Sequence, residues 1–191
     1  AMYYVVNEMF NAIKNATGVK YFAETEGITK SSVDDIITKI RRFGQPSIVG
    51  DFSVVSQLND FAGFQAVTGD ASSTKLPQSV MDEIRRTGLL NTYKGSSVVE
   101  LPNAYNLTEL NKAGDNFKTY LPEGLLFFIP QGKKSPLQVF QKGGLTSMNG
   151  NDIITGTEIT RFDMEIGAGV AKGQEHQIGL IRDTKYELPQ I

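Results

Sequence analysis

The chain has 191 residues, of which 40% are hydrophobic and 21% charged, and its formal net charge at pH 7 is −2. These values are typical of a globular protein, and the absence of cysteine excludes disulfides and thiolate metal sites. Basic residues cluster no further than pairs, which argues against bulk nucleic-acid binding, and no apolar run approaches the ~20 residues of a membrane span. Polar residues interrupt the stretch from Met2 to Ala16, so we expect no signal peptide there.

The first forty residues predict two helices separated by a short strand. Residues 2–16 carry a broad apolar face at helical spacing, and Gly18 follows the helix end, where glycine is favoured. Residues 19–23 favour a strand. A second apolar stripe at helical spacing then predicts a helix that begins at Ser31 or Ser32.

The stretch from Ser47 to Phe61 is the expected centre of the fold. Its first four residues, through Gly50, predict a short buried strand because they are rich in β-branched side chains and follow a proline. Asp51 or Ser53 can cap the helix that follows, since a short side-chain oxygen accepts a hydrogen bond from the first turn. A buried strand leading into an amphipathic helix indicates a mixed layer of helices and strands.

The middle of the chain predicts a loop, a short helix and a hairpin. Residues 62–77 are rich in Gly, Ser, Thr and Ala, which is typical of a loop, and the short helix after them ends at Gly88. Strands at 89–93 and 97–101 are joined by Lys94-Gly95, a hairpin turn.

The back half predicts strands and surface loops. Residues 104–120 are polar and irregular, and we expect an excursion over the surface. The run at 125–129, LLFFI, is the most hydrophobic in the chain and predicts a central strand. The pattern further predicts strands at 137–140, 158–166 and 177–182, and loops at 143–144 and 148–151.

The motifs that could carry chemistry are weak. His176 is the only histidine, and an imidazole without an orienting partner predicts a surface or structural role. Gly167 to Gly173 has the spacing G-x-G-x-x-x-G, but a strand pattern follows it, which favours a flexible hairpin connection over a dinucleotide loop. Asp163 and Glu165 share one face of a predicted strand, the solvent face. We therefore assign no catalytic, cofactor-binding or metal-binding residue and expect no enzyme and no cofactor.

Short motifs follow one another in a recognisable order along most of the chain. They are Gly27-Ile28-Thr29-Lys30, Val33-Asp34-Asp35-Ile36-Ile37, Ser47-Ile48-Val49-Gly50-Asp51, Glu83-Ile84-Arg85-Arg86-Thr87-Gly88, Asn91-Thr92-Tyr93-Lys94-Gly95, Val98-Val99-Glu100-Leu101-Pro102-Asn103, and the run from Leu121 to Pro130. In this order they resemble the tailed-phage major capsid proteins of the Hong Kong 97-like fold. The order carries the resemblance, because no single motif is specific.

The resemblance implies an α+β fold with intertwined axial and peripheral subdomains. Residues 1–30 would form the end of the spine helix and part of the peripheral domain. Residues 31–150 would form mainly the axial domain, and residues 151–191 the returning strands of the peripheral domain. The N-terminal arm and the extended hairpin loop of the family, which reach across neighbouring subunits, are expected to be absent, and the chain is interpreted as a fragment.

The function that the resemblance implies is structural. The chain would be a virion protein of a phage or prophage, assembled in the host cytoplasm into hexamers and pentamers of an icosahedral capsid around the genome. Scaffold, protease and portal proteins are further implied partners, whereas neither a membrane nor sequence-specific nucleic acid is expected. The loops at 62–77 and 104–120 would line contacts between subunits.

Two alternatives stay open at this stage. The first is an encapsulin-like compartment shell protein, which shares the fold but carries enzyme cargo. The second is a small-molecule-binding α/β domain that uses Asp163, Glu165 and Lys172 near the glycine loop; it would need a concave pocket with convergent polar groups.

Overall fold

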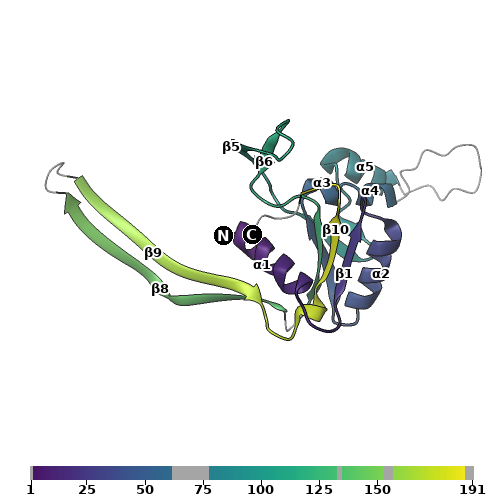
Figure 1. Cartoon of the computed structure of the whole chain (residues 1–191), viewed down its shortest axis with the longest axis horizontal. Helices are drawn as coiled ribbons and strands as arrows, with labels where there is room; N and C mark the ends of the chain where they lie inside the picture. Colours follow the sequence, from purple (N-terminus) through teal and green to yellow (C-terminus); the bar gives the residue numbers. More distant parts are fainter. Residues whose placement is uncertain (1, 62–77, 133–134, 153–156, 188–191) are drawn as a thin grey trace, which may run out of the picture.

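A six-stranded mixed sheet forms the centre of the computed structural model, which describes residues 2–61, 78–132, 135–152 and 157–187 (Figure 1). In spatial order its strands are β1 (Tyr21–Thr25), β10 (Gly179–Asp183), β7 (Leu125–Gln131), β2 (Gln45–Gly50), β4 (Ser96–Glu100) and β3 (Thr92–Tyr93). Helices cover both faces of this sheet, and two hairpins project from it. The α+β class expected from the sequence is confirmed. No helix within the described ranges is long and apolar enough to cross a membrane.

Strand β7 is the central strand that its sequence predicts. It pairs antiparallel with β10 on one side and with β2 on the other. Its side chains alternate between two cores: Leu126 and Phe128 enter one, whereas Leu125 and Phe127 enter the other. A strand covered on both faces has no polar positions, which explains the continuous apolar run.

Two helices supply the covers of the sheet. Helix α1 (Met2–Lys14) buries Val6, Met9, Phe10 and Ile13 against one face, and α2 (Lys30–Ile40) buries Val33, Ile36, Ile37 and Ile40 against the other. The expected start of the second helix at Ser31 or Ser32 is slightly wrong. Thr29 is the N-cap, and its side chain accepts a hydrogen bond from the backbone N–H of Ser32 at 3.4 Å.

The stretch after β2 confirms the predicted cap but not a continuous helix. Asp51 caps α3 (Phe52–Val55), and a second short helix, α4 (Leu58–Phe61), follows after a turn. In that turn the backbone bonds tighten to i→i−3 spacing, as between the N–H of Asn59 and the carbonyl of Ser56. Val54, Val55 and Leu58 are all fully buried, so the apolar stripe survives the break.

The short elements after this stretch follow their turn residues. Helix α5 (Gln78–Thr87) ends at Gly88, which has a φ of +77°. Lys94 and Gly95 both have positive φ in the turn that joins β3 to β4, as a two-residue hairpin of the primed type requires. The loop predicted at 62–77 lies outside the described residues.

Two predictions for the back half of the chain are wrong: the loops at 143–144 and 148–151, and the irregular structure at 104–120. Strands β8 (Leu137–Asp152) and β9 (Thr157–Val170) form one long hairpin that includes the expected loops at 143–144 and 148–151 and the glycines at 167 and 169. The strands predicted at 137–140 and 158–166 are therefore parts of one extended hairpin. The excursion at 104–120 is also ordered, as a hairpin of β5 (Tyr105–Leu110) and β6 (Phe117–Thr119).

Candidate assembly interface

The hairpin of β8 and β9 extends far from the body of the molecule (Figure 1). Its strands are 16 and 14 residues long and pair from Leu137 opposite Val170 out to Asp152 opposite Thr157. At about 3.3 Å per residue the longer strand spans about 50 Å. Among the described strands these two form a separate two-stranded sheet, so neither outer edge of the hairpin pairs with a further strand.

One face of this hairpin is apolar and exposed. Alternation along β9 places Phe162, Met164 and Ile166 on the same side, with 64%, 50% and 56% of their surface exposed. Val139 lies on this side of β8, because it pairs with Ala168, and it is 67% exposed. We call Val139, Phe162, Met164 and Ile166 the apolar stripe.

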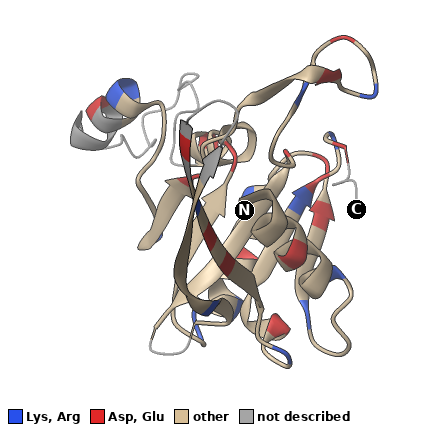
Figure 2. Cartoon of the chain, turned by 90° about the vertical axis from the view of Figure 1, so that its left-hand side faces the viewer, with Lys and Arg blue, Asp and Glu red and all other residues tan. Residues whose placement is uncertain are grey.

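The opposite face of the hairpin carries paired charges together with two exposed apolar side chains, Phe140 and Met148. Lys142 lies 3.2 Å from Glu165 across the two strands, and Arg161 lies 2.8 Å from Asp163 along β9. Figure 2 shows the acidic residues as red bands along the hairpin. The expectation that β9 is half-buried is wrong, because the apolar side faces solvent as fully as the charged side.

A bulge bends the hairpin near its middle. Between the pairs Lys142–Glu165 and Thr146–Asp163, three residues of β8 face a single residue of β9, Met164. Gly143 begins the bulge with a φ of +75°, a conformation that favours glycine. Extra residues in one strand bend and twist it, and the hairpin curves accordingly in Figure 1.

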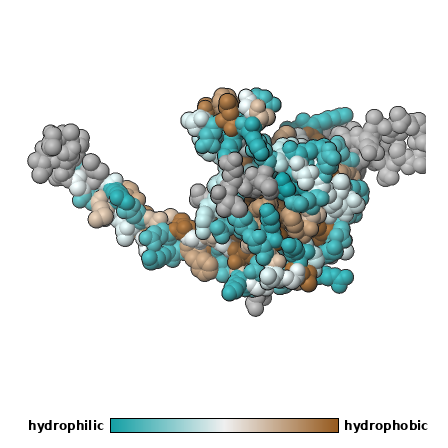
Figure 3. Space-filling model, in the orientation of Figure 1, coloured by the Kyte–Doolittle hydropathy of each residue, from teal (hydrophilic) through white to brown (hydrophobic). Residues whose placement is uncertain are grey.

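A second group of exposed apolar side chains surrounds the start of α1 and the β5–β6 hairpin. Its members are Met2, Tyr3, Tyr4, Tyr105, Leu107, Leu110, Phe117 and Tyr120. In Figure 3, brown surface gathers over β5–β6 and along β8–β9. Large exposed apolar patches are typical of protein interfaces, so the molecule carries two candidate contact surfaces.

A groove of about 590 Å³ runs through the second surface. It is lined by Met2 and Tyr3 from α1, and by Ala104, Tyr120 and Leu121 from the ends of the β5–β6 hairpin. Lys118 and Glu109, 3.4 Å apart, lie at its edge. We call this hollow the α1 groove.

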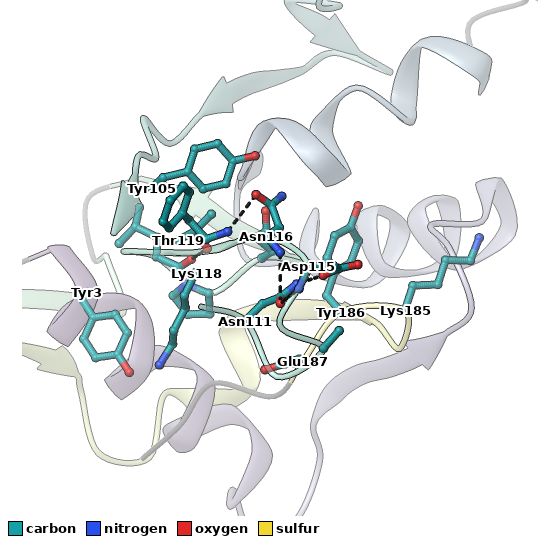
Figure 4. Close-up of a pocket in the computed structure, with 15 residues that line it drawn as sticks. Tyr3, Tyr105, Asn111, Asp115, Asn116, Lys118, Thr119, Lys185, Tyr186 and Glu187 are labelled. Atoms are coloured by element: carbon teal, nitrogen blue, oxygen red, sulfur yellow. Dashed lines mark hydrogen bonds between the residues drawn. The ribbon is translucent and has the colours of Figure 1, made fainter. Parts of the chain in front are cut away.

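A neighbouring hollow of about 360 Å³ is bounded by the loop that joins β5 to β6 (Figure 4). Asn111 organises this loop: its amide donates to Asp115 at 2.7 Å, and its side-chain oxygen accepts from the backbone N–H of Gly114 at 2.8 Å. Glu187 accepts from the backbone N–H of Lys112 at 3.0 Å and ties the loop to the end of the chain. These polar groups stabilise the loop itself.

Two titratable groups beside this hollow have raised pKa values. Burial raises the pKa of Glu123, and the nearby Asp51 carboxylate raises it further. Burial also raises the pKa of the Tyr186 phenol, with the carboxylates of Glu123 and Asp183 adding to the shift, while the nearby Ser53 side chain opposes it. Three carboxylates, those of Glu123, Asp183 and Asp51, therefore lie close to one phenol.

The structure separates the residues that the sequence singled out for chemistry. Asp163 and Glu165 each pair with a cation on the exposed hairpin, while Lys172 lies beyond the end of β9. His176 packs edge-on against Phe43, with ring centroids 5.5 Å apart. In the described ranges, His, Asp and Glu side chains form no group of three that could hold a metal ion.

Comparison with known proteins places the chain in a family. A family model described as "SPbeta prophage-derived putative capsid protein YonB" matches residues 1–182. The match spans both hairpins, the α1 groove and the central sheet. No curated protein matches the chain.

Proposed function

The chain belongs to the YonB family, a family of prophage-derived capsid proteins, and we propose that it builds the wall of a shell by associating with copies of itself. In this proposal the copies form hexamers and pentamers of an icosahedral capsid of the Hong Kong 97-like fold. The division into axial and peripheral subdomains, with boundaries near residues 30 and 150, belongs to the same proposal. Scaffold, protease and portal proteins would assist in the host cytoplasm.

The observation that carries the proposal is the exposed apolar stripe on a long hairpin. A two-stranded hairpin is at best marginally stable alone in water, and the apolar face of this one is open to solvent. A neighbouring molecule that covers the stripe would stabilise the hairpin and remove its apolar side chains from water. A shell supplies such a neighbour to every copy, because each subunit repeats the same contacts.

The charge of the chain agrees with a wall rather than a nucleic-acid-condensing protein. The formal net charge of −2 gives no long-range attraction to a polyanion. On the hairpin, Lys142 and Arg161 are compensated by Glu165 and Asp163. An encapsulin-like shell shares these properties and stays the alternative. The small-molecule-binding alternative has less support, because two of its three residues serve these ion pairs.

Light scattering with negative-stain microscopy tests the proposal. The chain is measured across a range of protein and salt concentrations. We expect a mass that rises with protein concentration, and arcs, rings or shells in the micrographs. A monomer mass under all conditions would contradict a self-associating shell subunit.

A further inference from the structure

We propose that the apolar stripe of the β8–β9 hairpin docks in the α1 groove of a second copy of the chain. The contact runs head to tail: each copy gives its hairpin to one neighbour and receives the hairpin of another. This inference rests on the proposed shell function and adds to it the identity and direction of one contact.

The two surfaces match in shape and chemistry. The stripe lies on a narrow ribbon of two strands, whereas the α1 groove is a hollow of about 590 Å³. The groove presents Met2, Tyr3 and Tyr120. Tyrosine rings and methionine thioethers adapt to apolar surfaces and are enriched at interfaces, so they suit Phe162 and Met164 of the stripe.

The hairpin cannot fill the groove of its own molecule. Leu137 and Val170, at its base, pack against the core around α1. Beyond that base the two strands run away from the body, and Figure 1 shows the outer hairpin well separated from β5 and β6. The stripe therefore meets an α1 groove only when the groove belongs to another copy.

The contact joins two different surfaces, which determines the kind of assembly that results. A contact between unlike surfaces leaves one free hairpin and one free groove at the ends of every chain of subunits. Such a chain grows until the rotation between neighbours closes it into a ring. Rings around an axis are the units from which the proposed hexamers and pentamers are made.

The size of the ribbon indicates how strong one contact is. The stripe runs along β9 from Ala168, opposite Val139, to Phe162, a length of about 20 Å. A ribbon two strands wide, about 10 Å, offers on the order of 200 Å² over that length. A stable pairwise interface buries about 800 Å² on each partner. A single docking event is therefore weak, and closure of the ring, where every copy makes two contacts, supplies the stability.

The test uses two complementary variants. Phe162→Asp places a charge on the stripe and leaves the groove intact, and Tyr120→Asp does the reverse. Gln138→Asp adds the same charge to the opposite face of the hairpin and is the matched control. Mass is measured by light scattering for each variant alone and for a 1:1 mixture, with circular dichroism to show that each is folded.

The expected result is specific to a head-to-tail contact. Each variant alone needs at least about tenfold more protein than the unmodified chain to associate, and Gln138→Asp behaves like the unmodified chain. The mixture forms heterodimers, because the intact hairpin of one variant meets the intact groove of the other. Met164→Asp and Ala104→Asp form a second pair if either first variant is unfolded.

Three outcomes would overturn the inference in distinguishable ways. If the unmodified chain associates while the mixed variants stay monomeric, the docking contact is wrong but the shell function survives. The same holds if only Phe162→Asp blocks association and Tyr120→Asp does not, since the stripe then contacts another hairpin or another surface. If the unmodified chain itself never associates, both the contact and the proposed function fail.

Discussion

Asp34 makes three side-chain contacts, two of which join α2 to the β3–β4 hairpin. Its carboxylate accepts hydrogen bonds from Lys30 at 2.7 Å, from Lys94 at 2.8 Å and from the Tyr93 hydroxyl at 2.9 Å. Burial raises the pKa of Asp34, but the hydrogen bonds from Lys30, Lys94 and Tyr93 outweigh it and hold the pKa below the usual 3.8. A depressed pKa means that the ionised form stabilises the folded state.

Asp34→Asn is expected to destabilise the protein by about 1–2 kcal/mol at pH 7, since two charge-assisted bonds weaken. The stabilisation by Asp34 is fully present above pH 3.8 and is lost as the pH falls through its lower folded pKa. Chemical denaturation at several pH values measures this difference. Asp35→Asn is the control: Asp35 makes one exposed ion pair with Lys39, so the loss should be under about 0.5 kcal/mol. Equal losses for the two variants would contradict this role of Asp34.

Gly124 lies at a close approach between two parts of the body. It has a φ of +76°, and an added Cβ would lie 2.8 Å from the Tyr186 Cβ and 3.1 Å from the Asp183 carbonyl oxygen. Gly114 has the same φ of +76° but no atom within 4 Å of an added Cβ. The two positions therefore differ in packing and share the same backbone conformation.

Substituting alanine at Gly114 and at Gly124 is expected to separate the cost of the positive φ from the cost of the steric contact with Tyr186. Gly114→Ala should destabilise by about 1 kcal/mol, because φ is positive. Gly124→Ala should cost about 1–3 kcal/mol more, because Tyr186 or the backbone must move. Thermal unfolding of both variants checks the difference, and equal shifts in Tm would show that the contact with Tyr186 relaxes freely.

At the scale of elements, the sequence predicts the helices and strands whose apolar side chains are buried within the same molecule. The LLFFI run of β7 is unambiguous because it is buried on both faces, and the helical stripes of α1 and α2 are equally clear. The ends of elements are harder to predict, because several neighbouring polar side chains can cap the same helix. Thr29, rather than Ser31 or Ser32, is the N-cap of α2.

The β8–β9 hairpin escaped prediction for a physical reason. Gly143 and Gly144 resemble turn residues, but they form a bulge within a strand, and Gly167 and Gly169 lie in a regular ladder. The alternation at 158–166 was visible, but an apolar face is ordinarily interpreted as the core side of a sheet. Here that face has no partner within its own described chain.

Hydrogen exchange is expected to distinguish β7 from the hairpin. In dilute protein, amides of β7 should exchange slowest, because both neighbouring strands and both cores protect them. Amides of residues 140–151 should exchange quickly, since a two-stranded ribbon opens easily. On association the hairpin amides should become protected while those of β7 change little. Slow exchange of the hairpin in dilute protein would contradict this expectation.

The whole molecule consists of a body with two hydrophobic cores and the long β8–β9 hairpin, whose outer part packs against neither core. Between residues 140 and 167, none of those that the structure describes is part of either core cluster. The sequence alone pointed to the α+β class and to a phage capsid protein, and the family match supports both the phage and the capsid role. The sequence alone did not predict the β8–β9 hairpin. In our account, the surface that stabilises this hairpin lies on another molecule. In our account the candidate site forms only between copies of the chain, so no catalytic or ligand-binding motif marks it.

The central claim is that the hairpin drives self-association, and shortening it tests this most directly. Val139 and Ala168 lie opposite each other, so an Asn-Gly turn can replace residues 140–167 and close a short hairpin. The shortened chain is compared with the full chain by light scattering and thermal unfolding. We predict that the full chain associates, whereas the shortened chain stays monomeric and unfolds at the same temperature. Association of the shortened chain to the same mass as the full chain would contradict the account.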